Sequence, residues 1–419
     1  MNEPRTPARY SEIFRLDGVA DPFPAYADLR QRAPVHRLVQ PDGVETWFVC
    51  RYEEARAALT DPRLAHHLSH ARTALESAGI ELTEERIEFG AAHLLHSDPP
   101  DHTRLRGVVK RAFTPAAIER LRPRVQQITD DLLDGIADRA GADLVETLAH
   151  PLPVLVICEL LGVPVADRDR FRVWAEAALT PSYVENRPMT RAAGDAALRE
   201  YLTELVERTR HDATVDDAAF DDRPDLLRTL ITARDEQGLL AEREVVAMLY
   251  LLLVAGFEST TNFLGNTILR LLLERVSLDR LRDDPALLHA AVEESLRLDG
   301  PVQRSTLRTA VQDLTIGGVA VPEGSVVSIG LASANRDRTR FADADAFHPD
   351  RSDQAHLAFG HGRHFCLGAP LARLEGEIAL SSLLRRYTTI RLAVRPEELR
   401  WRHTFLRGLT TLPVVFTAD

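Results

Sequence analysis

One short segment of the chain carries the residue types that could bind a metal or attack a substrate. The run Phe359-Gly360-His361-Gly362-Arg363-His364-Phe365-Cys366-Leu367-Gly368 places three glycines around a single cysteine. Glycines let a backbone approach a ligand closely. A helix expected to begin near Ala369 would favour negative charge at its N-terminus. Both features favour a thiolate at Cys366, which is the form of cysteine that binds metals.

Two other chemistries are open for the same residues. A zinc site could combine His356, His361, His364 and Cys366, although structural zinc sites usually bring their ligands in separated pairs. A cysteine nucleophile with a histidine partner is the second alternative. Neither of them requires the three glycines. The other two cysteines of the chain lie in apolar segments and are expected to be packed thiols.

A second unusual segment lies in the expected helix Glu242–Glu274, which is apolar nearly all round and should cross the core. Its centre reads Ala255-Gly256-Phe257-Glu258-Ser259-Thr260-Thr261. A glycine inside a helix costs about 1 kcal/mol relative to alanine, and burying a carboxylate costs more. One explanation is a close helix crossing at Gly256 with Glu258 at the surface. The other is a flat ligand against the small residues, with the carboxylate and hydroxyls handling protons beside it.

The elements that must position these segments are mostly helical, because helical periodicity dominates and strand signals are short. Helices are expected at Pro24–Arg32, Glu53–Thr60, His102–Ala112, Ala116–Arg139, Pro153–Leu161, Arg191–Arg210, Leu226–Asp235, Glu242–Glu274, Ala286–Leu298 and Ala369–Arg386. Strands are expected at Thr46–Cys50, Leu314–Ile316, Ser325–Ile329 and Leu412–Phe416. The irregular segments His66–Gly90 and Leu179–Thr190 are expected to be lids. The pattern predicts one large, mainly α domain with small β-sheets.

Composition excludes several classes of function. The net charge of −12 is spread along 419 residues, which argues against nucleic acid as a partner. The longest apolar run, Val245–Phe257, is well short of the roughly 20 residues that span a bilayer. The N-terminal segment Met1–Gly18 lacks the apolar core of a signal peptide. We therefore expect a cytoplasmic protein without a membrane partner.

With these residues in view, the chain resembles the cytochromes P-450, in particular the soluble bacterial class that uses a ferredoxin. The resemblance runs from about Asp21 to the C-terminus, so residues 1–20 are expected to be an N-terminal extension and 21–419 the haem domain. Phe359–Arg373 is similar to the haem-binding signature of the family. The other motifs are Glu294–Arg297 (the Glu-x-x-Arg pair), Phe347–Arg351 (the third triad arginine), Ala255–Thr260 (oxygen activation) and Asp98–Arg106 (the haem-contacting helix).

The resemblance implies a role for each matching residue. Cys366 would be the axial ligand of the iron of haem b, and Glu294, Arg297 and Arg351 would form a structural ionic triad. Contacts to the cofactor are implied for His102, Arg106, Ala255, Gly256, Arg308, Phe359, His364, Cys366 and Gly368. For each arginine, an ordinary surface ion pair is the alternative.

The implied catalytic residues are Glu258, Ser259 and Thr260, and here the chain departs from the family pattern. The usual alcohol after the acid is threonine, whereas this chain has Ser259. Serine keeps the hydroxyl but loses the methyl group that restricts its rotamer. Oxygen activation should therefore survive with weaker coupling to product formation. Phe257, where many relatives have histidine, is expected to pack away from the haem.

The implied activity is that of a monooxygenase, which inserts one atom of O2 into a small organic molecule by hydroxylation or epoxidation. Electrons would come from NAD(P)H through a separate ferredoxin and ferredoxin reductase. A cationic docking face for that ferredoxin could form from Arg104, Lys110, Arg111 and Arg363. A solvated helix surface is the other interpretation of the same residues.

The segment Leu298–Val302 looks like that of members that oxidise macrolides and other polyketides, so a secondary metabolite is the expected substrate. Substrate contacts are expected from Leu251, Val254, Arg304 and Thr306. Arg304 could bind an anionic group of the substrate or make a structural ion pair. Oxidative coupling, desaturation and peroxide-driven oxidation are alternatives within the same chemistry. A haem-binding sensor or carrier without turnover is an alternative from another class.

Overall fold

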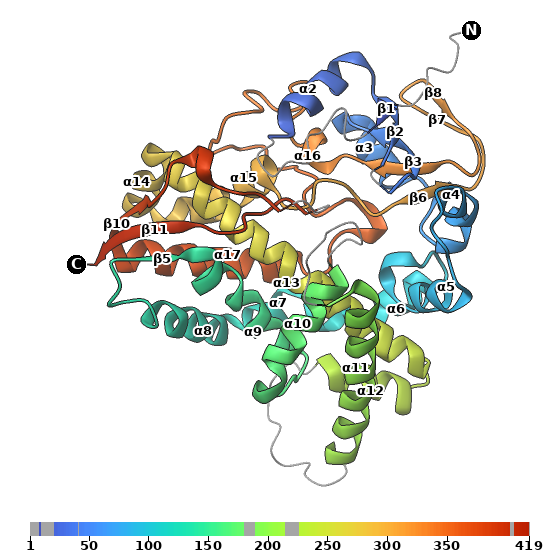
Figure 1. The fold of residues 1–419 in the computed structure, drawn as a ribbon, viewed down its shortest axis with the longest axis horizontal. Helices are drawn as coiled ribbons and strands as arrows, with labels where there is room; N and C mark the ends of the chain where they lie inside the picture. Colours follow the sequence, from blue (N-terminus) through green and yellow to red (C-terminus); the bar gives the residue numbers. More distant parts are fainter. Residues whose placement is uncertain are drawn as a thin grey trace.

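The computed structural model describes residues 8–9, 21–40, 42–179, 189–213, 226–402 and 406–418. Within these residues, helices make up most of the molecule, and the main sheet lies to one side of them (Figure 1). The prediction of a mainly α fold with small sheets is therefore confirmed.

The centre of the molecule is helix α13 (Glu242–Leu273), which is buried along most of its length. It contacts α9 (Pro151–Leu160), α11 (Arg191–Ala213), α15 (Leu288–Asp299) and α17 (Ala369–Arg386). Among the described residues it is the one helix long and apolar enough to cross a bilayer, and 56% of its most apolar stretch is buried inside the protein. It is thus packed as a core helix, as its all-round apolar character predicts.

The largest sheet has six strands, most of which come from the N-terminal part of the chain (Figure 1). Its order is β1 (Ala8–Arg9), β2 (Val35–Val39), β3 (Glu45–Val49), β9 (Val326–Ile329), β6 (Arg308–Ala310) and β4 (Leu64–Ala65). Because β6 belongs to this sheet, it fixes Arg308 at the edge of the helical core.

Two smaller sheets complete the strands. One has the order β10 (Tyr387–Leu392), β11 (Pro413–Ala418) and β5 (Gly141–Asp143). The other is the hairpin of β7 (Leu314–Ile316) and β8 (Val319–Val321). Its two-residue turn has positive φ angles, +54° at Gly317 and +80° at Gly318, which residues with side chains rarely adopt.

The other helices pack on these elements. Helices α7 (Pro115–Glu119) and α8 (Arg122–Asp134) contact α17, and α14 (Arg275–Asp283) contacts α13. Helix α16 (Leu331–Ala334) contacts α2 (Phe23–Arg32) and α3 (Tyr52–Ala58). The others are α4 (Arg72–Ser77), α5 (Glu84–Ala91), α6 (Asp101–Val109), α10 (Arg168–Leu179) and α12 (Leu226–Asp235), of which α10 contacts α11 and α12 contacts α6 and α13. In Figure 1, α10, α11 and α12 extend below the body of the fold, while α4 and α5 lie at one side.

Several local predictions need correction. The segment His66–Gly90 is not irregular, since it contains α4 and most of α5. The helix expected at Ala116–Arg139 is two helices, because Pro123 begins α8 as a separate element. Helices α10, α14 and α16 and strands β1, β2, β4, β5, β6, β8 and β10 were not predicted. Most of Leu179–Thr190 and nearly all of the N-terminal extension lie outside the described residues.

Candidate active site

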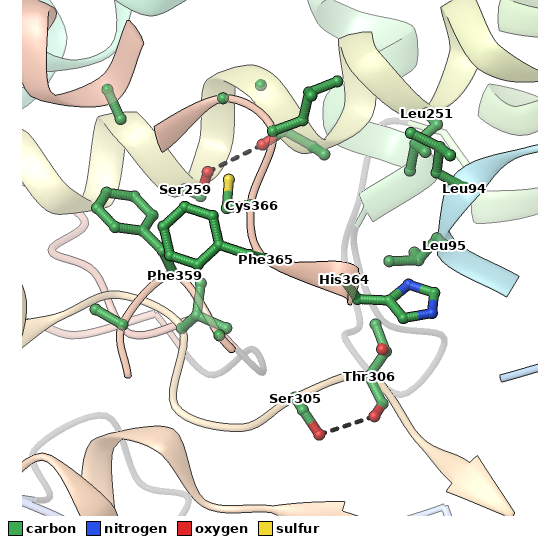
Figure 2. Close-up of a pocket in the computed structure, with 18 of the residues that line it drawn as sticks. Leu94, Leu95, Leu251, Ser259, Ser305, Thr306, Phe359, His364, Phe365 and Cys366 are labelled. Atoms are coloured by element: carbon green, nitrogen blue, oxygen red, sulfur yellow. Dashed lines mark hydrogen bonds between the residues drawn. The ribbon is translucent and has the colours of Figure 1, made fainter. Parts of the chain in front are cut away.

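A cavity lies between α13 and the cysteine loop, by which we mean Phe359–Gly368. The sulfur of Cys366 faces this cavity on the side of Ser259 (Figure 2). Phe359, Phe365 and Gly368 line the same space. The cysteine loop is therefore brought to the centre of α13.

The backbone of the cysteine loop explains its glycines. Gly360 and Gly362 have φ angles of +72° and +77°, where a side chain would be strained. A Cβ atom at Gly362 would also lie 2.8 Å from Thr60 Cγ2. The amide of Cys366 donates to the carbonyl of Phe359 at 2.9 Å, which closes the loop. The glycines are thus required by the turn that presents the sulfur.

Electrostatics at Cys366 act in two directions. Burial raises the pKa of the thiol, whereas the amides of Gly368 and Ala369 and the charges of Arg106 and Arg373 lower it. The net effect is a raised pKa for the thiol when no metal is bound to the sulfur. A metal cation bound to the sulfur deprotonates a coordinating thiol outright. The expected thiolate at Cys366 therefore stays a prediction for the metal-bound site.

At one end of the cavity, cationic and imidazole side chains gather. The ring centroid of His364 lies 4.1 Å from that of His102 and 3.6 Å from that of His66. Arg308 donates from Nη1 to the carbonyls of Ala58 and Leu59, both at 3.0 Å. Four buried nitrogens have no hydrogen-bond partner in the described structure: His66 Nδ1, His102 Nε2, His364 Nε2 and Arg308 Nε.

The unpartnered nitrogens show what kind of group would complete this end of the cavity, and so whether haem fits it. Burial together with nearby positive charge lowers the pKa of His364 to about 2 and that of Arg308 to about 10. Burial also lowers the pKa of His102, ahead of the charges of Arg106 and Arg363. Buried donors almost always have partners, and carboxylates satisfy both the donors and the excess positive charge. The two propionates of haem meet this requirement, so the residues fit the group.

Sequence reasoning identified His102, Arg308 and His364 at this end but missed His66. His66 lines the cavity, and its backbone amide donates to the Asp98 carboxylate at 2.9 Å. The signal that could have found it is Asp98 itself, which begins the segment that resembles the haem-contacting helix. Arg106 also lines the cavity, where its Nη2 donates to the carbonyl of Phe365 at 2.8 Å.

The middle of α13 forms the opposite wall of the cavity. Ala255, Gly256, Ser259 and Thr260 all line it. Ser259 Oγ donates to the carbonyl of Ala255 at 2.9 Å (Figure 2), and Thr260 Oγ1 donates to that of Gly256 at 3.1 Å. Because each hydroxyl gives its proton to its own helix, each oxygen is left with lone pairs that can accept a proton.

The structure bears on both explanations for the unusual α13 residues. A Cβ atom at Gly256 would lie 3.1 Å from Ile157 Cδ1 of α9, so a close helix crossing does occur there. Gly256 also lines the cavity. Glu258, however, is 8% exposed rather than at the surface, and it is not among the lining residues. Phe257 is buried outside the cavity wall, as expected.

Glu375 is a cavity residue that the sequence reasoning missed. It lies on α17, is 2% exposed and has a carboxyl oxygen, Oε2, without a hydrogen-bond partner in the described structure. Burial raises the pKa of this carboxyl well above its ordinary value. The signal was present in the sequence, because Glu375 shares the apolar face of α17 with Leu371, Leu374 and Ile378.

The predicted triad forms as a buried cluster. Arg297 donates from Nε and Nη2 to the two carboxylate oxygens of Glu294 at 2.7 and 2.8 Å, and Arg351 Nε lies 3.1 Å from both. The remaining donors of Arg297 bind the carbonyls of Asn335, Ala344 and Ala346. The triad thereby ties α15 to the chain that leads into the cysteine loop.

A second ionic cluster, which was not predicted, lies beside the first. Arg373 of α17 donates to the two carboxylate oxygens of Glu293 at 2.6 and 2.7 Å, and His356 Nε2 lies 3.2 Å from Glu293 Oε2. Hydrogen bonds from Arg373 and His356 outweigh desolvation and lower the pKa of Glu293 to about 2. Glu293 therefore joins the two ends of the segment that carries Cys366.

The structure separates the expected substrate contacts into two groups. Leu251 and Thr306 line the cavity, together with Leu94 and Leu95 (Figure 2). Val254 and Arg304 are not among the residues that line this cavity, so substrate contact at these two positions stays a prediction. Val254, three residues after Leu251 on α13, packs against the hydrophobic core. Arg304 is held by a hydrogen bond from its Nη1 to Gln40 Oε1, so its contact is structural.

The geometry bears on two further interpretations, the zinc site and the docking face. No group of three or more histidine, cysteine or acidic residues within the described ranges could hold a metal ion by itself, and His356 is bound to Glu293. This argues against the zinc site. Among the proposed docking residues, Lys110, Arg111 and Arg363 are exposed, whereas Arg104 is engaged by the carboxylates of Glu244 and Asp101.

Comparisons with known proteins agree with this site. The family model described as cytochrome P-450 matches residues 182–407. The mycinamicin IV hydroxylase/epoxidase of Micromonospora griseorubida is 42% identical over 395 residues (93% of this chain, 94% of that protein). The polyketide biosynthesis cytochrome P-450 PksS of Bacillus subtilis is 38% identical over 398 residues (94% and 95%). The structure of the monooxygenase TamI bound to tirandamycin C matches with a TM-score of 0.86 and 41% identity (98% and 100%).

Proposed function

The chain belongs to the cytochrome P-450 family and is a haem-thiolate monooxygenase that uses O2, and from that premise we propose that its substrate is a macrolide or another polyketide. The observation that carries this proposal is the agreement between relatives of known role. One is a hydroxylase/epoxidase of mycinamicin IV, one serves polyketide biosynthesis, and one was solved with tirandamycin C. Hydroxylation or epoxidation is the reaction we assign.

The residues that would hold haem b are those already described. Cys366 would ligate the iron, and His66, His102, His364, Arg106 and Arg308 would receive the propionates. Bound haem supplies the oxygen chemistry, while the protein supplies binding, orientation and protons. An anionic sulfur ligand at Cys366 would support that oxygen chemistry by donating electron density to the iron. Phe359 and the α13 residues Ala255 and Gly256 would enclose the flat faces of the group.

The hydroxyls of α13 are suited to pass protons into the cavity. Ser259 and Thr260 each accept a proton on oxygen and can release their own by leaving the carbonyl that they bind at rest. Glu258, buried one residue before Ser259, is the acid that we assign to recharge this hydroxyl. Ser259 Oγ is the group for which the departure from threonine matters, since serine rotates more freely.

The relay assignment can be tested at Ser259. Ser259→Thr should raise the amount of product formed per NAD(P)H consumed, because the added methyl group restricts the rotamer. Ser259→Ala should lower it, because the hydroxyl is lost. Both variants should keep the same haem content. An alanine variant with the coupling of the parent protein would remove Ser259 from the relay.

The substrate class can be tested by optical titration. Purified protein should show a conversion from low-spin to high-spin haem when a macrolactone displaces water near the iron, whereas a hydrophilic sugar of similar size should give none, because Leu94, Leu95 and Leu251 present an apolar wall. A panel in which simple terpenes bind and every polyketide fails would contradict the proposed substrate class. Product analysis with the best binder would then distinguish hydroxylation from epoxidation.

Electrons must reach this monooxygenase from redox partners, and we assign a ferredoxin and its NAD(P)H-dependent reductase in the cytoplasm. An acidic ferredoxin would dock on Lys110, Arg111 and Arg363, which are exposed near the cysteine loop. Lys110→Glu should slow electron transfer and weaken its dependence on salt. Arg120→Glu, a charge reversal on another exposed residue, is the matched control. Equal rates for the two variants would exclude this docking face.

A further inference from the structure

The second ionic cluster reaches the cysteine loop through one aromatic ring. The guanidinium carbon of Arg373 lies 4.7 Å from the ring centroid of Phe359, a residue that lines the cavity. The carbonyl of Phe359 in turn accepts a hydrogen bond from the amide of Cys366 at 2.9 Å. A guanidinium over an aromatic face is attracted to it by a cation–π contact. Arg373 is therefore linked to the residue of the sulfur ligand through Phe359 alone.

Glu293 holds Arg373 in this position. The Nε and Nη2 atoms of Arg373 donate to the two carboxylate oxygens of Glu293 at 2.6 and 2.7 Å, and such a bidentate pair fixes the plane of the guanidinium. The side chain of Glu293 is 6% exposed and that of Arg373 is 27% exposed. Salt and water screen a partly buried pair much less than a pair on the surface, so its field acts inside the protein.

The field of this pair has a direction, because one of its two charges acts more strongly on the sulfur. Burial raises the pKa of the Cys366 thiol, and the charges that oppose this rise most strongly are those of Arg106 and Arg373. In the haem-loaded protein, the charge of Arg106 would be offset by the propionate assigned to it. Arg373 then remains as the cation that acts on the sulfur, and the opposing charge of Glu293 acts more weakly.

We propose that the Glu293–Arg373 pair sets the reduction potential of the iron that Cys366 ligates, with the positive charge of Arg373 raising this potential. Reduction adds one electron to the iron, so a nearby cation stabilises the reduced form more than the oxidised form. The electron comes from the redox partner already assigned. The same cation holds electron density on the sulfur, so that less is donated to the iron. The pair thus favours acceptance of the electron.

The test is a spectroelectrochemical titration of the haem-loaded protein without substrate. At the potential where the parent protein is half reduced, Arg373→Gln should lower the ratio of reduced to oxidised iron roughly tenfold, the order expected for the loss of one charge inside a protein. Glu293→Gln should raise the ratio, because it removes the opposing charge. Arg373→Lys should stay close to the parent. A merely structural role would move the two glutamine variants in the same direction.

Arg385→Gln is the matched control. Arg385 is an exposed arginine of the same helix, about three turns beyond Arg373, so the same loss of charge there should leave the ratio unchanged. Equal shifts in Arg373→Gln and Arg385→Gln, or shifts of the same sign in Arg373→Gln and Glu293→Gln, would overturn the proposal. Should Arg373→Gln fail to bind haem, the double variant with Glu293→Gln decides, since it leaves no buried carboxylate unpaired. A ratio below that of the parent supports the proposal, and an equal or higher ratio overturns it.

A second measurement on the same samples separates this proposal from the haem-thiolate assignment on which it rests. The reduced, carbon monoxide-bound proteins should all keep the thiolate band, while the C–O stretching frequency falls in Arg373→Gln and rises in Glu293→Gln as donation from the sulfur changes. A parent protein without the thiolate band would remove the ligation by Cys366 itself. A normal band with unshifted potentials in both variants would remove only the role of the pair. Neither result depends on the proposed polyketide substrate.

Discussion

Two regions of the molecule use arginine–carboxylate pairs in opposite ways. Beneath the cysteine loop lies an ionic support, by which we mean Glu294 with Arg297 and Arg351, and Glu293 with Arg373. Its carboxylates are almost fully buried, and Arg297 is 1% exposed. Most of its hydrogen-bonding groups are satisfied by protein atoms.

The second region, the lid contacts, joins α5 and α11 to α13. Arg199 binds Asp195 at 2.9 Å and Glu85 at 3.2 Å, and its guanidinium lies 3.8 Å from the ring centroid of Phe89. Tyr250 of α13 donates to Asp195. Glu85, however, is 85% exposed, so water competes for much of this cluster.

Burial, rather than the number of ion pairs, determines how much each ion pair contributes to stability. A buried carboxylate that loses its partner is left with an uncompensated charge, which costs about 3–5 kcal/mol. An exposed pair contributes about 0–1 kcal/mol. The ionic support therefore fixes the cysteine loop, while the lid contacts contribute little to stability and can break at little cost.

The largest effect should follow from breaking the centre of the ionic support. Glu294→Ala leaves Arg297 and Arg351 without their carboxylate, and we expect a loss of about 3–5 kcal/mol in the free energy of unfolding. Little of the protein should fold with haem. Haem content and thermal unfolding measure this effect. Abundant, fully loaded Glu294→Ala protein would mean that the cysteine loop does not depend on the triad.

The second cluster predicts a dependence on pH. The folded protein lowers the pKa of Glu293 to about 2, against about 4.3 for an ordinary glutamate. Its contribution to stability, of order 2–3 kcal/mol, is present above pH of about 4.3 and is lost as the pH falls toward 2. Glu293→Gln should therefore flatten the acid limb of the stability curve. An identical acid limb in the two proteins would show that the pair contributes nothing.

The lid contacts should respond much more weakly. Tyr250→Phe removes one hydrogen bond to Asp195, while Arg199 keeps its own contact, so we expect a loss of about 1 kcal/mol or less in overall stability. Amide hydrogen exchange in α5 and α11 should become faster, because these two helices would separate locally from α13 more often. The ionic support should be unaffected. Faster exchange around the cysteine loop would show that the two regions are coupled.

The smallest effect should come from an ion pair at the surface of the lid. Arg243 binds Glu88 at 3.2 Å, with side chains that are 65% and 64% exposed. Arg243→Gln should change stability by no more than about 0.5 kcal/mol, and raised salt should remove even that difference. A loss of several kcal/mol would break the distinction between buried and exposed pairs.

The sequence predicted the parts of the site that depend on short motifs. Cys366 is found from the glycines next to it, and Glu294 and Arg297 form one helical turn. By contrast, the contact between Glu293 and Arg373 joins residues 80 positions apart. His66 reaches the cavity through sheet pairing and Asp98. Such contacts are set by tertiary packing, which local patterns do not encode.

The helices of the fold divide in the same way, into those that local sequence patterns predict and those that depend on tertiary packing. Long apolar helices such as α13 and α17 were found with nearly correct ends, because their periodicity extends over many turns. Helices α4 and α5 were missed, since they are only 6 and 8 residues long and have little apolar character. Their helical state depends on packing against α13 and the neighbouring sheet rather than on propensity.

The most direct test of the account is the optical spectrum of the reduced, carbon monoxide-treated protein. A haem iron ligated by the sulfur of Cys366 should give the red-shifted Soret band of a thiolate complex. Cys366→Ser should lose that band, and Cys158→Ala, a change at a buried thiol away from the cavity, should keep it. A colourless parent protein, or a thiolate band that survives in Cys366→Ser, would contradict the account.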